Sequence, residues 1–354
     1  MKHLFRLATF VILVATMALP GGAFAKGLAQ TSSSKTYTVL VGYENTHQAV
    51  DVMGYFPGVV TIHVGDTVHW KLNSKEIHTV TFNADLTQPL IIQGADPSIS
   101  PIMISPYASD PVIPTEMNDV KTFANSGIMG PDSGEFKNFS LTFAKPGTYN
   151  YLCLVHGAVM SGQVVVKGLD ESVPSPNQET AMGKKQISAQ LAKVPAVLKA
   201  ANAQVKPAEK NSDGSMTHYI LLGYESGQID LMRFFPKMTN VKPGDTVVWE
   251  MSPKNGAPHT VTFLNGAPSP DLFKVVSPYL YINPEVVFPS PLPPQPGEVL
   301  TRTGIFSSGI TNPTPGTLTP FYTLKIGNMT PGLLPYECLL HDDSGMTGSL
   351  QVLP

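Results

Sequence analysis

An internal repeat constrains the fold of this 354-residue chain more than any other feature of its sequence. Three motifs occur twice in the same order: Val-Gly-Tyr-Glu at 41–44 matches Leu-Gly-Tyr-Glu at 222–225, Gly-Asp-Thr-Val at 65–68 recurs at 244–247, and His-Thr-Val-Thr-Phe at 78–82 recurs at 259–263. The offsets of 181, 179 and 181 residues are nearly constant. Solenoid repeats are only about 20–50 residues long. The sequence therefore predicts a duplicated domain.

Each copy has the pattern of β-structure. A Gly-Asp turn signal at 65–66 precedes a Thr-Val-His-Trp strand, and Pro-Gly at 146–147 opens the strand that ends at Cys153. The chain has 30 Gly and 33 Pro but only 14% charged residues, which argues against a coiled coil or a disordered chain. Short strands separated by turns predict an all-β sandwich or barrel in each copy. A formal net charge of -3 gives no support for nucleic-acid binding.

Two further segments interrupt or join the copies. A long stretch rich in Pro, Ser and Gly separates His78 from Cys153, and a similar one separates His259 from Cys338, so each is expected to be a surface excursion that covers one face. Residues 168–213 are rich in Lys, Ala, Gln and Glu, which indicates a linker.

The linker is predicted to be partly helical. A capping box begins at Ser175, and a kink is expected at Pro195. The apolar stripe that we expect to pack on one of the domains consists of Ile187, Leu191, Val194, Val197 and Leu198.

The first 25 residues are predicted to be a signal peptide. The positively charged N-terminal region contains Lys2, His3 and Arg6. Residues 7–19 are almost entirely apolar, and Ala-Phe-Ala at 23–25 matches a signal-peptide cleavage site. The alternative is an uncleaved membrane anchor. No other stretch approaches the roughly 18 apolar residues of a membrane span. We therefore expect an exported protein, periplasmic or extracellular, with no transmembrane segment in its mature chain.

The two cysteines lie in equivalent motifs. Cys153 and Cys338 each begin a Cys-x2-His motif with a Met a few residues later, and each copy supplies one more His upstream. The candidate metal ligands are His78, Cys153, His156 and Met160 in the first copy and His259, Cys338, His341 and Met346 in the second. Two Cys in an exported chain ordinarily suggest a disulfide, and buried Cys and Met are ordinarily core residues. Their recurrence instead favours His2Cys sites with a weak axial Met, the ligand type of blue copper.

Both copies resemble the plastocyanin/azurin family of cupredoxins, over residues 36–167 and 217–354. The second loop has that family's Cys-x2-His-x4-Met spacing, and the first is one residue shorter. The resemblance implies two tandem cupredoxin-like Greek-key β-sandwich domains, 36–167 and 214–354, with one type 1 copper ion in each. It also implies that His156 and His341 have exposed edges that meet redox partner proteins. Thr79 and Thr260 stand where the family often has Asn, which affects the contact to the thiolate.

An electron carrier is the function that this pattern favours. The alternatives are a two-domain copper oxidase or nitrite reductase and a copper-sequestering binding module. Such enzymes need further histidines, commonly in His-x-His pairs or directly before the Cys. This chain has no His-x-His pair, and Leu152 and Glu337 precede the two cysteines. The remaining histidines of the mature chain, His47, His63, His69 and His218, are expected to be ordinary strand and turn residues. No catalytic residue is assigned.

Overall fold

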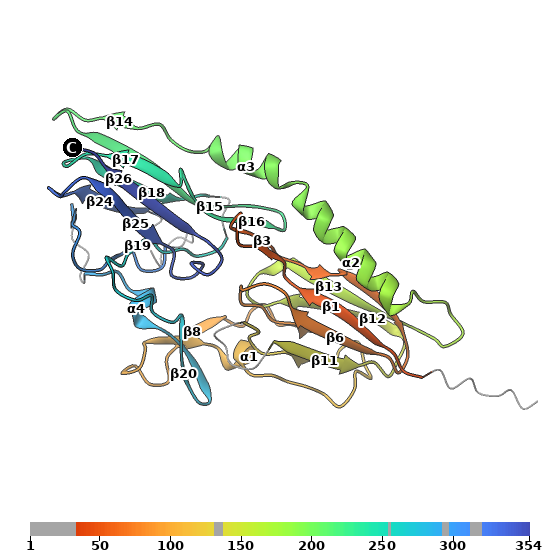
Figure 1. The fold of residues 1–354 in the computed structure, drawn as a ribbon. Coiled ribbons are helices and arrows are strands. Elements are labelled where there is room, and N and C mark those ends of the chain that lie inside the picture. The colour runs from red at the N-terminus through yellow and green to blue at the C-terminus, as the bar shows by residue number, and fades with distance from the viewer. Residues whose placement is uncertain (1–32, 131–136, 254–255, 292–296, 312–320) are drawn as a thin grey trace, which may run out of the picture. The chain divides into compact units, whose positions relative to one another are not determined.

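The computed structural model describes residues 33–130, 137–253, 256–291, 297–311 and 321–354 (Figure 1). The expected signal peptide, 1–25, lies outside these ranges. Within them, no helix combines the length and hydrophobicity that a membrane span requires. Residues 34–354 form one compact unit, so the domain boundaries predicted from the sequence remain predictions.

The first copy consists of two sheets that enclose one core. One sheet has the order β11-β6-β1-β4, with β1 (Thr36–Val41), β4 (Tyr55–Phe56), β6 (Thr67–Leu72) and β11 (Asn138–Thr142). The other has the order β10-β7-β12-β13-β5, with β5 (Val59–His63), β7 (Thr81–Phe82), β10 (Ala124–Asn125), β12 (Gly147–Cys153) and β13 (Gly157–Lys167). Alternate residues of both sheets are buried in the same cluster, so this copy is a β-sandwich.

The second copy repeats this strand order. Its first sheet runs β16-β15-β18-β24, and its second runs β23-β19-β25-β26-β17. The strands are β15 (Met216–Ser226), β16 (Ile229–Phe235), β17 (Met238–Val241), β18 (Thr246–Met251), β19 (Thr262–Phe263), β23 (Phe306–Ser307), β24 (Phe321–Ile326), β25 (Gly332–Glu337) and β26 (Thr347–Val352). Two short strands, β14 (Glu209–Lys210) and β22 (Val299–Leu300), extend the first of these sheets. The predicted all-β fold is confirmed.

The repeated motifs determine how each sandwich is closed. Gly65 and Gly244 have φ of 87° and 93°, a left-handed conformation that glycine adopts readily. The side chain of the following Asp accepts two backbone hydrogen bonds in each copy, which fixes the turn. The strand after the turn buries Trp70 against Phe82, with ring centroids 5.6 Å apart, and its counterpart buries Trp249 in the same way. This packing fixes the segment between His78 and Phe82.

Two strand pairings join the copies. β3 (Val50–Val52), which also pairs with β2 (Glu44–Asn45), pairs antiparallel with β16 and places Asp51 opposite Asp230. The insertions form a second, smaller sheet of order β20-β21-β9-β8, made of β8 (Ile91–Gln93), β9 (Ile102–Ile104), β20 (Phe273–Val276) and β21 (Tyr279–Ile282). Short helices α1 (Pro106–Ser109) and α4 (Pro284–Val287) follow β9 and β21. The insertions are therefore more than surface excursions, because each pairs with the other.

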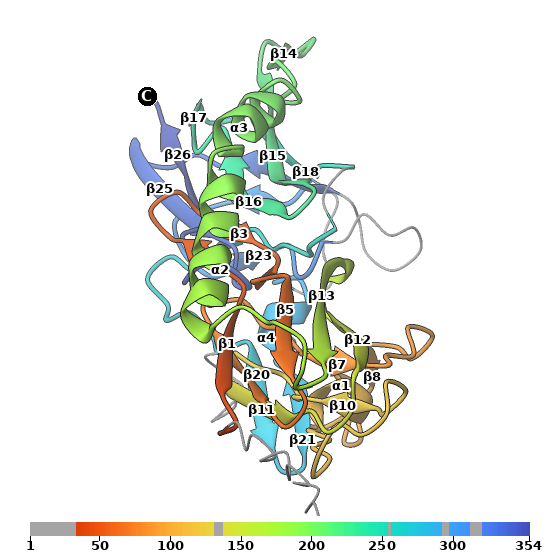
Figure 2. The ribbon, with the colours of Figure 1, turned by 90° about the vertical axis from the view of Figure 1, so that its right-hand side faces the viewer.

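The linker forms two helices, α2 (Pro176–Leu191) and α3 (Val194–Asn202), which follow one another along the two copies (Figures 1 and 2). The predicted capping box at Ser175 is present. The helix is interrupted between Leu191 and Val194, directly before Pro195, where a kink was expected. The apolar stripe contributes to a cluster that includes Val50 of the first copy and Leu231 of the second. The expectation that it packs on one domain was therefore wrong.

Candidate metal centres

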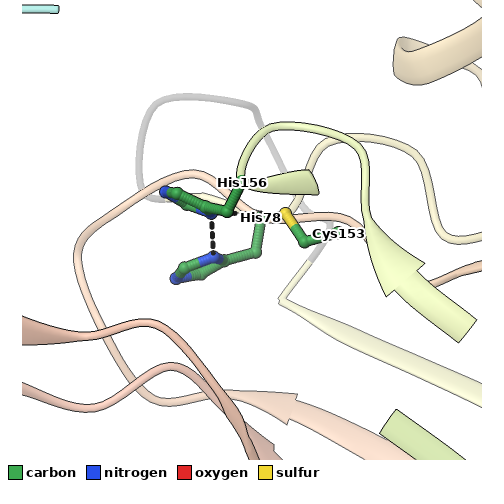
Figure 3. A group of neighbouring side chains, drawn as sticks. All are labelled: His78, Cys153 and His156. Atoms are coloured by element: carbon green, nitrogen blue, oxygen red, sulfur yellow. Dashed lines mark hydrogen bonds between the residues drawn. The ribbon is translucent and has the colours of Figure 1, made fainter. Parts of the chain in front are cut away.

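The first His–Cys–His group lies at the end of the first sandwich (Figure 3). Cys153 is the last residue of β12, His156 lies in the turn that follows, and His78 pairs with Met129 in an isolated bridge. His156 Nδ1 lies 3.2 Å from His78 Nδ1 and 3.4 Å from Cys153 Sγ. The outer nitrogen of His78, Nε2, is 2.8 Å from Ser74 Oγ, which holds the ring with Nδ1 facing the thiol.

The second group repeats this geometry. His341 Nδ1 lies 3.0 Å from His259 Nδ1 and 3.5 Å from Cys338 Sγ. The distance from Cys338 Sγ to His259 Nδ1 is 3.9 Å. Among the described residues, these are the two places where three potential ligand atoms from His, Cys, Asp or Glu lie within 4.8 Å of one another.

The donor atoms fit a thiophilic metal ion. Burial lowers the pKa of His156 to about 4 and holds the pKa of His78 and His259 well below its usual value. Neutral imidazole is the form that binds metals. In the first group, His78 Nδ1 and His156 Nδ1 face each other beside the thiol of Cys153, and a cation bound among the three atoms would be held by all of them. Imidazole with thiolate is a donor set for copper or zinc.

The two methionines lie in the cores beside these groups. Met160 is fully buried in the cluster that contains Cys153, and Met346 is fully buried in the cluster that contains Cys338. The Met346 backbone accepts a hydrogen bond from Cys338 N and donates one to the His341 carbonyl, which closes the second loop. Their role as axial ligands remains a prediction.

Thr79 and Thr260, whose contacts could not be predicted from the sequence, lie against the two cysteine loops. Thr79 N donates to Cys153 Sγ at 3.3 Å, and its hydroxyl accepts from Leu154 N at 2.8 Å. Thr260 makes the same two contacts, to Cys338 Sγ at 3.3 Å and from Leu339 N at 2.7 Å. The backbone N–H favours the ionised thiol, and the hydroxyl ties the histidine segment to the cysteine loop.

Both cysteines are free, and each is buried in the core of its own copy. Burial raises the pKa of Cys153, an effect that the hydrogen bond from Thr79 opposes. The disulfide alternative therefore does not describe this structure.

One expectation about the second group was wrong. His341 is only 7% exposed, so it has no open edge toward solvent, whereas His156 is partly exposed. Glu76, in the loop before His78, covers the ring and places Oε2 3.5 Å from His341 Nε2. Burial alone would lower the pKa of His341, but the negative charges of Glu76 and Cys338 raise it to about 10. The sequence gives no sign of this contact, because the two residues belong to different copies.

Three of the other histidines have partners within the sheets and turns. His63 Nε2 contacts the Glu171 carbonyl, His69 Nδ1 contacts Ser140 Oγ, and His218 Nε2 contacts Asp245 Oδ2. His47 lies exposed in a turn. None of the four belongs to either metal-ligand group of the described residues.

The comparison with known families decides the identity of the first copy. A family model described as copper-binding proteins of the plastocyanin/azurin family matches residues 41–167. This part of the chain belongs to the plastocyanin/azurin family. The first His–Cys–His group lies within the matched residues, and together they indicate a copper-binding protein.

Solved structures of cupredoxins are also similar to this chain. An oxidised mutant of amicyanin is 20% identical, with 37% of this chain and 82% of that chain covered and a TM-score of 0.22. A mutant plastocyanin of a fern is 23% identical, with 37% of this chain and 99% of that chain covered and a TM-score of 0.21.

Proposed function

We propose that the mature chain is an exported electron-transfer protein that holds one type 1 copper ion in each copy. The observation that carries the proposal is the recurrence of one buried His–Cys–His geometry at equivalent ends of two sandwiches with the same strand order. The ligands would be His78, Cys153, His156 and Met160 at one site and His259, Cys338, His341 and Met346 at the other. Domains of 36–167 and 214–354, with 168–213 as linker, are part of the proposal.

The residues around each group suit rapid electron transfer. Copper, when bound, supplies a centre that changes between Cu(I) and Cu(II). The donor atoms lie close together, and buried strands and the Thr79 and Thr260 contacts hold them in place. A site that keeps its geometry in both oxidation states has little to reorganise when an electron arrives or leaves.

Electron exchange between the two sites is part of the proposal. His156 and His341 line one cavity between the copies. Because His156 is the more exposed of the two, a redox partner would exchange electrons with the first site, and the second would be reached through it.

A redox titration with optical detection tests the proposal. The copper-loaded mature chain should show two reversible one-electron steps and no turnover of nitrite or phenols. Turnover of either substrate would instead support the copper enzyme alternative. Copper that binds but cannot be reduced and reoxidised would support sequestration. Recovery of the chain, cleaved near Ala25, outside the cytoplasm of an expressing cell tests export.

A further inference from the structure

Four carboxylates lie in a row across the junction of the two copies. Glu44 on β2 is opposite Asp51 on β3, Asp51 is opposite Asp230 on β16, and Asp230 is opposite Glu225 on β15. Residues directly opposite on adjacent strands project from the same face of a sheet, and like charges in such positions repel. The row therefore lowers the free energy of unfolding unless another group compensates for its negative charge.

The outer and inner members of the row differ in their partners. Glu44 Oε2 accepts a hydrogen bond from Lys75 N, and Glu225 Oε2 accepts one from Gly256 N. The inner pair is more deeply buried: Asp51 is 1% exposed and Asp230 4%. Both carboxylate oxygens of Asp51 and Oδ1 of Asp230 have no hydrogen-bond partner. An unpaired buried carboxylate is among the most expensive groups that a protein can hold.

These aspartates line a cavity of about 410 Å³. Its wall also contains Glu76 and Glu225, apolar side chains such as Met53 and Leu340, and the rings of His156 and His341. Lys75 is the one Lys or Arg among the lining residues, and its Nζ donates to the Asp343 carbonyl rather than to an aspartate. The cavity is therefore strongly acidic and has room for a small molecule.

We propose that this cavity binds a small organic cation that carries an ammonium or guanidinium group, whose N–H groups pair with Asp51 and Asp230. A bare metal ion fits less well. Within the described residues, only the two His–Cys–His groups bring three ligand atoms within 4.8 Å of one another, so the cavity carboxylates do not converge on a point. An N–H cation is larger, donates in several directions and forms charge-assisted hydrogen bonds with carboxylates. The apolar wall offers a surface for its hydrocarbon part.

The titration of the aspartates is consistent with this site. Burial and the neighbouring carboxylates raise the pKa of Asp51, and burial raises the pKa of Asp230 to about 7. The charge of His341 lowers the pKa of both aspartates but does not cancel the effect of burial, so protons compensate for part of their negative charge and a bound cation would displace these protons. Binding should therefore release protons. The pairing with the cation does not require copper, because neither aspartate is a candidate copper ligand.

Isothermal titration calorimetry of the full mature chain, with copper loaded and without, tests the site at low ionic strength and pH 8. The probes are butylammonium and butylguanidinium, with butyltrimethylammonium as a cation of similar size that lacks N–H groups. We expect the first two to bind, with proton release shown by buffers of different ionisation enthalpy, and the third to bind at least roughly tenfold more weakly. Equal binding of all three, or no binding, would overturn the proposal. Binding of calcium or manganese ions with none of the organic cations would show a metal site instead.

Variants locate the binding. Asp51→Asn and Asp230→Asn should each weaken butylammonium binding at least roughly tenfold, because one charged partner is lost. Without ligand, neither should lower the thermal midpoint, since the Asp51 oxygens and Asp230 Oδ1 make no hydrogen bond that the amide would lose. Asp271→Asn, an exposed acid on the wall of the same cavity, is the matched control and should leave affinity nearly unchanged. If all three variants bind like the unaltered chain, or if Asp271→Asn weakens binding as much as the others, the assignment to the buried pair is wrong.

Discussion

Glu76 of the first copy covers His341 of the second, with Glu76 Oε2 3.5 Å from His341 Nε2. The Nδ1 atom of the same ring faces Cys338 Sγ and His259. A carboxylate beside one imidazole nitrogen favours the ring orientation that directs the other nitrogen toward a metal. The first copy therefore contributes a residue to the surroundings of the second His–Cys–His group.

Replacing Glu76 tests this relationship. Glu76→Ala should lower copper affinity at the second site roughly 10–100-fold, the usual cost of losing a carboxylate behind a ligating histidine. In a Cys153→Ser background, where only the second site retains its thiolate, competition with a chelator measures this affinity. Glu76→Gln should recover much of the loss, because an amide oxygen can still lie beside Nε2. The exposed neighbour Asp343→Asn is the control. Unchanged affinity in Glu76→Ala would mean that the carboxylate plays no part in orienting the ring.

The hydroxyls of Thr79 and Thr260 are expected to contribute to stability. Thr79→Ala leaves Leu154 N without its acceptor, and an unsatisfied buried donor costs about 1–3 kcal/mol. Chemical denaturation of the metal-free chain should show this loss, whereas Thr79→Ser should retain most of the stability. The same comparison applies to Thr260 and Leu339 N. Equal stability of the Ala and Ser variants would show that the hydrogen bonds of these hydroxyls to the cysteine loops do not contribute to stability.

The thioethers of Met160 and Met346 are expected to affect the reduction potential of copper more than its binding affinity. Met160→Leu and Met346→Leu should each keep copper and raise the potential of the altered site, because a lost sulfur donor stabilises Cu(II) less. Since the two loops differ by one residue, the unaltered sites should also have distinguishable potentials. Spectroelectrochemistry of each variant measures the change. Loss of copper from either variant would make that Met a principal ligand.

Electrons are expected to enter through the first site. His156 is partly exposed and His341 is buried beneath Glu76, so a partner protein can approach only the first ring closely. With a soluble cytochrome as electron donor in stopped-flow, Cys153→Ser should slow reduction of the second copper strongly. Cys338→Ser should leave reduction of the first copper nearly unchanged. Fast reduction of the second copper in Cys153→Ser would show that it has its own entry point.

The features that could be predicted from the sequence are those that depend on neighbouring residues or on the internal repeat. The Gly-Asp turn, the buried Trp strand and the capping box at Ser175 each follow from neighbouring residues, and the structure contains all three. The His, Cys and second His of each copy were grouped because their spacing recurs, and the structure brings both sets together.

What the sequence did not reveal are the contacts between the copies. The pairing of β3 with β16, the joined insertions and the Glu76 contact connect residues that are far apart in the chain and carry no motif of their own. The burial of His341 follows from these contacts. The resemblance to the plastocyanin/azurin family implied an exposed ring, but it carried no information about a contact between the two copies.

Copper binding by the unaltered chain and by two single variants tests the central claim most directly. Loaded with Cu(II), the mature chain should bind two copper ions and show an intense visible thiolate-to-copper charge-transfer band. Cys153→Ser and Cys338→Ser should each remove about half of that band, and the double variant should be colourless. A colourless protein that takes up zinc in preference, or a band that disappears entirely with either single variant, would contradict two independent blue copper sites.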